Sequence, residues 1–477
     1  MNNLYIFAIG GSGSRVLRSL TMLMASGVSM ESNVIPMIID PDTSNGDLNR
    51  TVSLLRLYES IHGQLSFSNS SSNRFFQSNV TSLNNDGSYL LPLVGTAGIN
   101  FDKFLGLGTM SPENQAFTKM LFSNMNLSST MDVGFKGNPN IGSIVLNQFT
   151  QSSAYDKFDK NFVQGDKVFI ISSIFGGTGA SGFPLLLKTM RTSTNAALSA
   201  APIGAVSLLP YFNLKADNRS KIQADSFITK AKAALNYYEK NVTGNNTLNE
   251  MYYLGDDFSS HSYENYDGGD NQMNDAHLIE LLAALSIVNF DSKQYVQQQR
   301  STNFHEFGLS QSPQSSVIFS DFGPATRKII QKPLTLMAIM NSYLNNRNES
   351  HRNSQKWTKD KKSRLGADFF SSEFFSEYLS FKSCFESWLD EMERNQISFA
   401  PFDSDDALAT ADGLAKVIGV TPQYPGINPF RKKGYDLIDE KLGANLSAVA
   451  GNQSAPNTFM ELFYTTLSEI CKTNLNI

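Results

Sequence analysis

The stretch FGGTGASGFP, residues Phe175–Pro184, follows the apolar run DKVFIISSI and precedes the amphipathic segment LLLKTMR. This order predicts a buried β-strand that passes through a glycine-rich turn into an α-helix. Glycine allows positive φ and a close approach of the backbone to a phosphate, and the start of a helix attracts negative charge. The stretch therefore predicts a phosphate-binding turn, although a tight turn without a ligand explains a single loop equally well.

A second glycine-rich loop, IGGSGSR at Ile9–Arg15, follows a predicted strand at Leu4–Ile9 and precedes a predicted helix that ends near Gly27. The next strand is VIPMIID, so the order strand, turn, helix, strand predicts a parallel sheet with a right-handed crossover. We interpret this as the beginning of a doubly wound α/β domain. Two glycine loops in one domain are stronger evidence than one, because each can hold a different part of one polyphosphate.

The pattern divides the chain into two domains, a nucleotide-binding domain over residues 1–291 and a helix-rich C-terminal domain over 292–477. Within the first domain, the Ser/Asn-rich segment of about 58–131 indicates a surface insertion. Strands and helices then alternate again, at the segments KVFIISSI, IGAVSLLPYF, KIQADSFITKAKAALNYYEK, MYYL and NDAHLIELLAALSIV. In the second domain, the phenylalanines of 369–385 indicate a core or a partner interface.

Composition excludes several classes of protein. The 477 residues are 41% hydrophobic and carry a net charge of -5, which argues against a disordered chain and against a nucleic-acid-binding surface over the whole molecule. Cys384 and Cys471 are the only cysteines, as expected in the reducing cytoplasm, and the five histidines have no metal-site spacing. The sequence has no export signal and no apolar run of 18 residues, so we expect no membrane span.

Two familiar nucleotide motifs fit the loops poorly. Neither loop has the lysine that a Walker loop places after its last glycine, which disfavours a P-loop enzyme. A dinucleotide fingerprint starting at Gly11 has Val16 where its third small residue belongs. A Rossmann oxidoreductase stays open as an alternative, but it leaves the second loop unexplained.

Taken in order, six pieces of the chain resemble the tubulin and FtsZ superfamily of GTPases over about 290 residues. They are AIGGSGSRVLRSL, IIDPDTSNGDL, GFKGNPNIGS, FGGTGASGFP, PYFNLKADNR and NDAHLIELLAAL. The resemblance implies a doubly wound, mostly parallel sheet of the tubulin/FtsZ type and a bacterial tubulin-like GTPase that uses GTP or GDP with Mg²⁺. We expect no metal site built from protein ligands alone.

The resemblance also implies the residues that contact the nucleotide. Arg15 replaces a polar residue of the family, and its side chain either reaches a phosphate or lies on the surface. Asp256 replaces a guanine-reading asparagine, and a carboxylate can still accept hydrogen bonds from guanine. The full set is Gly10, Gly11, Ser12, Gly13, Arg15, Asp40, Asp42, Gly137, Asn138, Gly176, Gly177, Thr178, Gly179, Ser181, Phe212, Arg219, Asp256, Asn274 and Asp275.

Hydrolysis in this superfamily depends on an acidic loop that a neighbouring subunit supplies, which implies head-to-tail self-association. Here NFDSKQY contains Asp291, but Gln294 holds the place of the second aspartate. Asp291 and Asp321 are therefore two alternative catalytic acids. We expect a slow GTPase that forms filaments or oligomers, and the alternative is a nucleotide-gated module that does not hydrolyse GTP and recruits an unidentified partner through its C-terminal domain.

Overall fold

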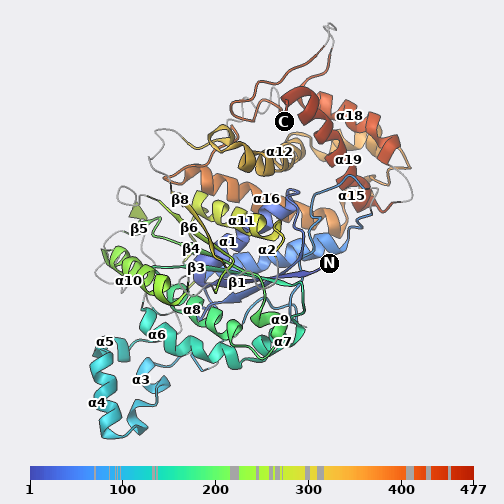
Figure 1. Cartoon of the computed structure of the whole chain (residues 1–477). Helices are drawn as coiled ribbons and strands as arrows, with labels where there is room; N and C mark the ends of the chain where they lie inside the picture. The colour runs from blue at the N-terminus through green and yellow to red at the C-terminus, as the bar shows by residue number, and fades with distance from the viewer. Residues whose placement is uncertain are drawn as a thin grey trace.

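The computed structural model of the chain (Figure 1) describes most of the 477 residues. The described residues are 1–68, 71–84, 86–91, 93, 95–96, 98–131, 135, 138–214, 225–242, 247–256, 262–263, 269–270, 272–295, 301–308, 316–403, 413–425, 431–449 and 453–477. Gly137 and Arg219, which the sequence assigns to the nucleotide site, lie outside them. Among the described helices, none is long and apolar enough to cross a membrane.

A six-stranded parallel sheet forms the centre of the molecule, with the strand order β2-β1-β3-β4-β6-β8. Its strands are β1 (Asn3–Ile9), β2 (Asn33–Ile39), β3 (Lys167–Ser173), β4 (Ile203–Leu208), β6 (Glu250–Gly255) and β8 (Asn303–Gly308). The direction of strand addition reverses between β1 and β3, which is where a doubly wound sheet opens a crevice at its carboxyl edge. The predicted doubly wound, parallel sheet is confirmed, and β8 extends it beyond residue 291.

The outer edge of β2 is covered by two short extended pieces of the chain. Val34 pairs with Val80, and Ile38 pairs with Leu90, both in the parallel sense. Backbone hydrogen bonds of 2.8–3.0 Å support both contacts. These pieces lie within 58–131, the segment that the sequence suggests is an insertion, and they occupy the position of a further strand beside β2.

Helices cover both faces of the sheet (Figure 1). Tyr5 and Phe7 of β1 contact Phe158 at 5.0 Å on one face, whereas Phe169 of β3 contacts Phe290 at 5.3 Å on the other. The first face carries α7 (Ser153–Asn161), α8 (Gly177–Arg191) and α10 (Asp225–Asn241), and the second carries α1 (Gly10–Ala25), α2 (Gly46–Gly63) and α11 (Leu278–Asp291). Helix α11, which the sequence predicts within NDAHLIELLAALSIV, begins at Leu278, after Asn274 and Asp275.

The C-terminal part is helix-rich, as predicted. It consists of α12 (Pro324–Asn346), α13 (Glu349–Ser354), α14 (Lys356–Lys359), α15 (Ala367–Phe370), α16 (Glu373–Arg394), α18 (Gly434–Val449) and α19 (Ala455–Ile470). Helix α16 packs against α2, and the Trp388 indole donates a hydrogen bond of 3.2 Å to the Ser19 hydroxyl of α1. Phe374, Phe381 and Phe385 are buried, so they belong to the core.

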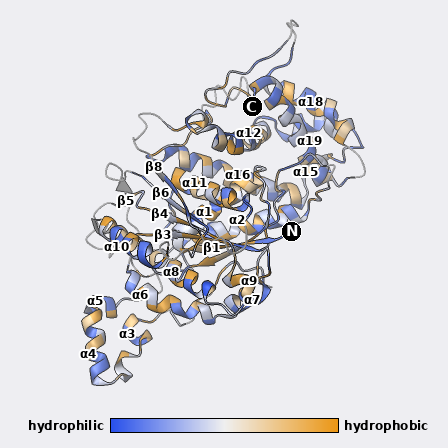
Figure 2. Cartoon of the chain, in the orientation of Figure 1, coloured by the Kyte–Doolittle hydropathy of each residue, from blue (hydrophilic) through white to orange (hydrophobic). Residues whose placement is uncertain are grey.

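A small helical part projects from the opposite side of the molecule. It contains α3 (Phe101–Phe104), α4 (Pro112–Leu121) and α5 (Asn124–Leu127), and α6 (Pro139–Val145) joins it to the body (Figure 1). Figure 2 shows hydrophobic positions along α4 and α5, and Phe117, Met120 and Met125 are exposed there.

Pro184 lies inside α8 and lacks the N–H that would bond the carbonyl of Ala180. The hydroxyl of Tyr238, which is fully buried on α10, donates a hydrogen bond of 3.3 Å to that carbonyl. The Phe183 ring packs on Tyr238 with 5.1 Å between centroids. Tyr238 thus satisfies the acceptor that Pro184 leaves open and holds α10 against α8.

We expect Tyr238→Phe to lower the free energy of unfolding by about 1–3 kcal/mol, because it leaves a buried carbonyl unpaired. Chemical denaturation monitored by circular dichroism measures the loss. In a Pro184→Ala background the backbone N–H is restored, so the same change should cost clearly less. Equal costs in the two backgrounds would show that the hydroxyl does not serve this carbonyl.

Candidate phosphate-binding site

The two glycine loops meet at the carboxyl edge of the sheet, where its order reverses. Helix α1 begins at Gly10, directly after β1, and α8 begins at Gly177, four residues after β3 ends. A Cβ built on Gly10 would lie 3.5 Å from the Cβ of Thr178. Because β1 and β3 are neighbours, the first turns of both helices face one crevice.

Both helix starts leave their backbone N–H groups without a side-chain cap. The residues before them are Ile9 and Gly176, neither of which has a side-chain acceptor, and neither first turn contains an acidic residue. By contrast, Asn45 caps α2. Unpaired N–H groups and the positive end of the helix dipole favour an anion, so this arrangement suits two or more phosphate oxygens.

The glycines also serve packing, which the sequence interpretation did not include. A Cβ on Gly13 would lie 2.7 Å from the carbonyl carbon of Ala8, and one on Gly179 would lie 2.6 Å from the carbonyl oxygen of Ser173. Both positions therefore require glycine for the close approach of helix to strand. Gly10 has a φ of +74°, which favours glycine for a conformational reason.

Arg15 neither lies on the surface nor points at the helix starts. Its side chain is buried and forms ion pairs with Glu280 at 2.6 Å and Asp47 at 3.5 Å, and it donates a hydrogen bond to the Tyr211 hydroxyl. Burial alone would lower the pKa of Arg15, but the charges of Glu280 and Asp47 and the hydrogen bond to the Tyr211 hydroxyl hold it well above its usual value. The guanidinium is thus neutralised inside the protein.

Asn274 and Asp275 lie in the segment that leads into α11. The Asn274 amide donates to Asp47 at 2.7 Å, and its backbone N–H donates to the same carboxylate at 3.1 Å. Asp275 is exposed and accepts hydrogen bonds of 2.7 and 3.0 Å from Arg394 of α16. His277 caps α11 and forms a capping box with Glu280.

Asp40 and Asp42 follow β2, and Asp40 lies beside Gly10 because Ile39 and Ile9 are paired in register. The Asp42 carboxylate accepts from the Gly269 N–H at 2.7 Å and from the Ser44 hydroxyl at 2.8 Å. Burial raises the pKa of Asp40 to about 7, and the Asp42 backbone N–H only partly opposes this effect.

The two candidate catalytic acids have different surroundings. Asp291 is 1% exposed and accepts from the Glu31 N–H at 2.7 Å, the Ser32 N–H at 3.0 Å and the Ser32 hydroxyl at 2.6 Å. Lys167 approaches it at 3.5 Å, so Asp291 sits at the amino ends of β2 and β3, the far end of the sheet from the glycine loops. Asp321 is exposed, and its carboxylate accepts from the Ile318 N–H at 2.8 Å.

The remaining predicted residues lie around the same edge of the sheet. Ser181 donates to the Gly177 carbonyl at 2.7 Å, inside the first turns of α8. Phe212 packs on Phe175 with 5.4 Å between ring centroids. Asn138 directly precedes α6, and Asp256 follows β6. Gly11, Ser12, Gly176 and Thr178 are partly exposed, which leaves both loops accessible.

Sequence reasoning missed the ionic network behind the loops. Asp47 and Arg50 pair at 2.7 Å within α2, which their spacing could have suggested. Arg50 also pairs with Glu391 of α16 at 3.2 Å. Arg18 donates two hydrogen bonds of 2.5 and 2.9 Å to the same carboxylate. Nothing in the local sequence indicates a pair separated by 373 residues.

The chain matches no family model and no curated protein. Among solved structures, it is similar to CetZ from Methanosaeta thermophila strain DSM 6194 over 62% of this chain and 57% of that one, with 14% identity and a TM-score of 0.32. It is also similar to a GTPγS-bound protofilament of CetZ2 from Haloferax volcanii over 63% of this chain and 61% of that one, with 13% identity and a TM-score of 0.29. The match therefore spans less than two thirds of either protein, and TM-scores this low add no weight to a site assignment.

We predict that Asp40 lowers the free energy of unfolding by an amount that depends on pH. Its pKa in the folded state is about 7, above the ordinary value of 3.8, so between about pH 4 and pH 7 the folded protein keeps a proton that the unfolded chain has lost. Stability should fall as pH rises through this window. Asp40→Asn should match the wild type at pH 4 and exceed it at pH 8, by at most about 4 kcal/mol.

Urea denaturation at both pH values measures this difference, with Asp368→Asn on the exposed surface as the control. A constant difference between Asp40→Asn and wild type across the range would contradict a raised pKa.

Proposed function

We propose that this chain binds a guanine nucleotide at the crevice between α1 and α8, as a tubulin/FtsZ-like GTP-binding protein. The observation that carries the proposal is the convergence of two uncapped helix starts on one edge of a parallel sheet. Each start offers several backbone N–H donors and a positive dipole end to a phosphate chain. The six ordered sequence pieces that resemble this superfamily add independent support.

The triphosphate is held mainly by backbone groups in this proposal. Arg15 is neutralised by Glu280 and Asp47, so the positive end of each helix and the hydroxyls of Ser12 and Thr178 take the place of a phosphate-binding side-chain cation. Among the described residues, no group of three acidic, histidine or cysteine side chains could hold a metal ion. Mg²⁺ would then be held by the phosphates and water with at most one or two carboxylates, its usual arrangement in nucleotide sites.

Guanine recognition is assigned to the acidic residues beside the crevice. Asp275 is the exposed member, and Asp256 at the end of β6, which is partly buried, is the second. A carboxylate that accepts the two guanine N–H protons makes charge-assisted bonds that adenine cannot reproduce. Asn274 has a supporting role, because its amide is bound to Asp47.

GTP should therefore bind about tenfold more tightly than ATP, or better, since such bonds are worth about 1.5–3 kcal/mol. Calorimetric titration of both nucleotides tests this expectation. Asp275→Asn should weaken GTP binding, whereas Arg394→Met, which removes only the partner of Asp275, should leave it unchanged or stronger. Equal losses of GTP affinity in both variants would show that Asp275 only holds α16 in place. Equal affinities for GTP and ATP would refute guanine recognition.

Head-to-tail self-association and slow hydrolysis belong to the same proposal, with Asp321 as the acid that a neighbouring subunit presents. The second candidate is a nucleotide-gated module without turnover, in which the C-terminal helices recruit a partner. The burial of Asp291 favours this second function. Its oxygens are already bound to Ser32 and the Glu31 N–H, so it is not available to a second molecule.

Phosphate release measured against protein concentration separates these two functions. If Asp321 completes the site between subunits, turnover per molecule should rise with concentration, and Asp321→Asn should reduce it at least tenfold with GTP affinity retained. Asp368→Asn, an equally exposed change in the C-terminal part, is the control. Tight GTP binding without turnover at any concentration would select the gated module.

A further inference from the structure

A pocket of about 790 Å³ lies beside the candidate phosphate site, between α6, α8 and α10. Its α8 wall consists of Ala180, Ser181, Pro184, Leu185 and Lys188, which share one face of that helix. None of its described lining residues belongs to the glycine loops at 10–13 and 176–179, although Asn138 and Ser181, which the sequence assigns to the nucleotide, form part of its wall. It is therefore a separate cavity, with a volume typical of a small-molecule site.

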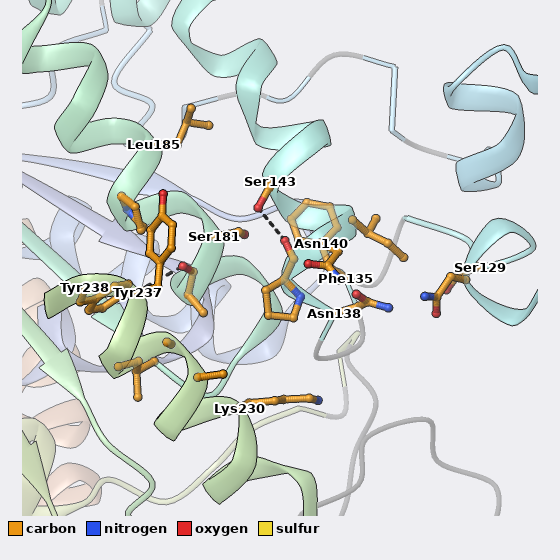
Figure 3. Close-up of a pocket in the computed structure, with 18 of the residues that line it drawn as sticks. Ser129, Phe135, Asn138, Asn140, Ser143, Ser181, Leu185, Lys230, Tyr237 and Tyr238 are labelled. Atoms are coloured by element: carbon orange, nitrogen blue, oxygen red, sulfur yellow. Dashed lines mark hydrogen bonds between the residues drawn. The ribbon is translucent and has the colours of Figure 1, made fainter. Parts of the chain in front are cut away.

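The opposite wall comes from one face of α10, at residues 230, 233, 234, 237 and 238. Figure 3 shows Lys230, Tyr237 and Tyr238 on this side, across the opening from Asn138 and Asn140 near the start of α6. Tyr238 is fixed by its bond to the Ala180 carbonyl, so this wall is held in place.

The charged residues that the structure describes in the lining carry one sign. Lys188 and Lys230 are its only charged members among the described residues, and no described aspartate or glutamate lines the pocket. Lys230 is only partly exposed, and burial lowers the pKa of its amine. An anion placed next to it would offset that desolvation.

The rest of the lining is mostly apolar. Phe135, Ile141 and Ile174 are buried and contribute hydrocarbon surface, and Leu185 and the two tyrosine rings extend it. Ser181 and Asn138 add a small number of hydrogen-bonding groups. A mainly apolar cavity with a few polar groups, whose described lining includes two lysines, matches an amphipathic anion.

We propose that this pocket binds a small amphipathic anion, an apolar ring system or chain that carries one carboxylate, sulfonate or phosphate group. Lys230 holds the anionic group, and Lys188 at the exposed end of the wall attracts it. The apolar body rests on Phe135, Leu185 and the tyrosine rings. This site goes beyond the proposed function and does not rest on it.

Occupancy of the pocket would also contact the first turns of α8. Ala180 and Ser181 line the cavity and directly follow Gly179, and the Ser181 hydroxyl is bonded to the Gly177 carbonyl. Gly142 of α6 packs closely here, because a Cβ on it would lie 2.2 Å from the Ser181 hydroxyl. A ligand would therefore brace the same turns that present N–H groups to a phosphate.

Fluorescence titration with two dyes tests the proposal on the full chain. The first dye, 8-anilino-1-naphthalenesulfonate, is an amphipathic anion, and the second, N-phenyl-1-naphthylamine, has the same rings without the charge. The sulfonate dye should bind at least tenfold more tightly than the neutral one. Lys230→Met should remove most of that preference, whereas Lys232→Met, on the exposed face of α10 outside the pocket, should keep it.

Ala233→Trp supplies an independent test, because Ala233 is exposed and lines the pocket, so a larger side chain should fill the cavity without disturbing the core. It should abolish high-affinity binding of the sulfonate dye. If Lys230→Met does not fold, Lys188→Met replaces it as the test of charge, and it should weaken binding of the sulfonate dye. Binding that persists unchanged in Ala233→Trp would place the dye elsewhere, for example on the exposed apolar residues of α4. That result, or equal affinities for the two dyes, would overturn the proposal.

Discussion

The arrangement of the crevice depends on the buried ion pairing of Asp47 and Glu391 with three arginines. Asp47 contacts Arg15 and Arg50, and Glu391 contacts Arg18 and Arg50, at 2.5–3.5 Å. Although burial alone would raise the pKa of Glu391, the bonds and charges of Arg18 and Arg50 lower it. Buried pairs of this kind stabilise a fold little overall, but loss of one partner costs about 3–5 kcal/mol.

This network joins elements that are distant in the sequence. Helices α1, α2 and α16 each contribute charged side chains, and the segment before α11 is tied in through Asn274 and through the Ala276 N–H, which donates to Glu391 at 2.9 Å. The position of α1 fixes where its first turn presents backbone N–H groups. Because Arg15 is used to hold this geometry, the groups that the crevice offers to an anion are helix dipoles and backbone donors.

The sequence predicted those parts of the structure that depend on local pattern. Apolar runs followed by glycine identified β1 and β3 and their helices, and the order of the elements gave the parallel sheet. The strand-like pairing of Val80 and Leu90 with β2 was not predictable. Val80 lies in a polar stretch, Leu90 lies in the short apolar piece YLLPLV, and both contacts are held by backbone bonds to β2. The start of α11 was placed too early, because histidine is not a typical N-cap residue.

The candidate site was predictable to a different degree at each residue. The sequence indicated that positions 13 and 179 need glycine, and it attributed this need to phosphate contact. The structure shows a close approach of helix to strand at both positions. A single sequence does not distinguish these two reasons for a glycine. The partners of Arg15 and Arg18 lie far along the chain, so their burial could not be inferred. Tertiary pairing, not local propensity, decides which charged groups remain free to meet a ligand.

The central claim is that the first turns of α1 and α8 together hold the phosphates of one guanine nucleotide. Hydrogen–deuterium exchange with mass spectrometry tests it directly, by comparing the chain alone with the chain in saturating GTP and in guanosine. The account predicts slower exchange with GTP in both peptides, the one that begins at Gly10 and the one that begins at Gly177, and no such change with guanosine. Protection confined to one of the two loops, or absent from both with GTP bound, would contradict it.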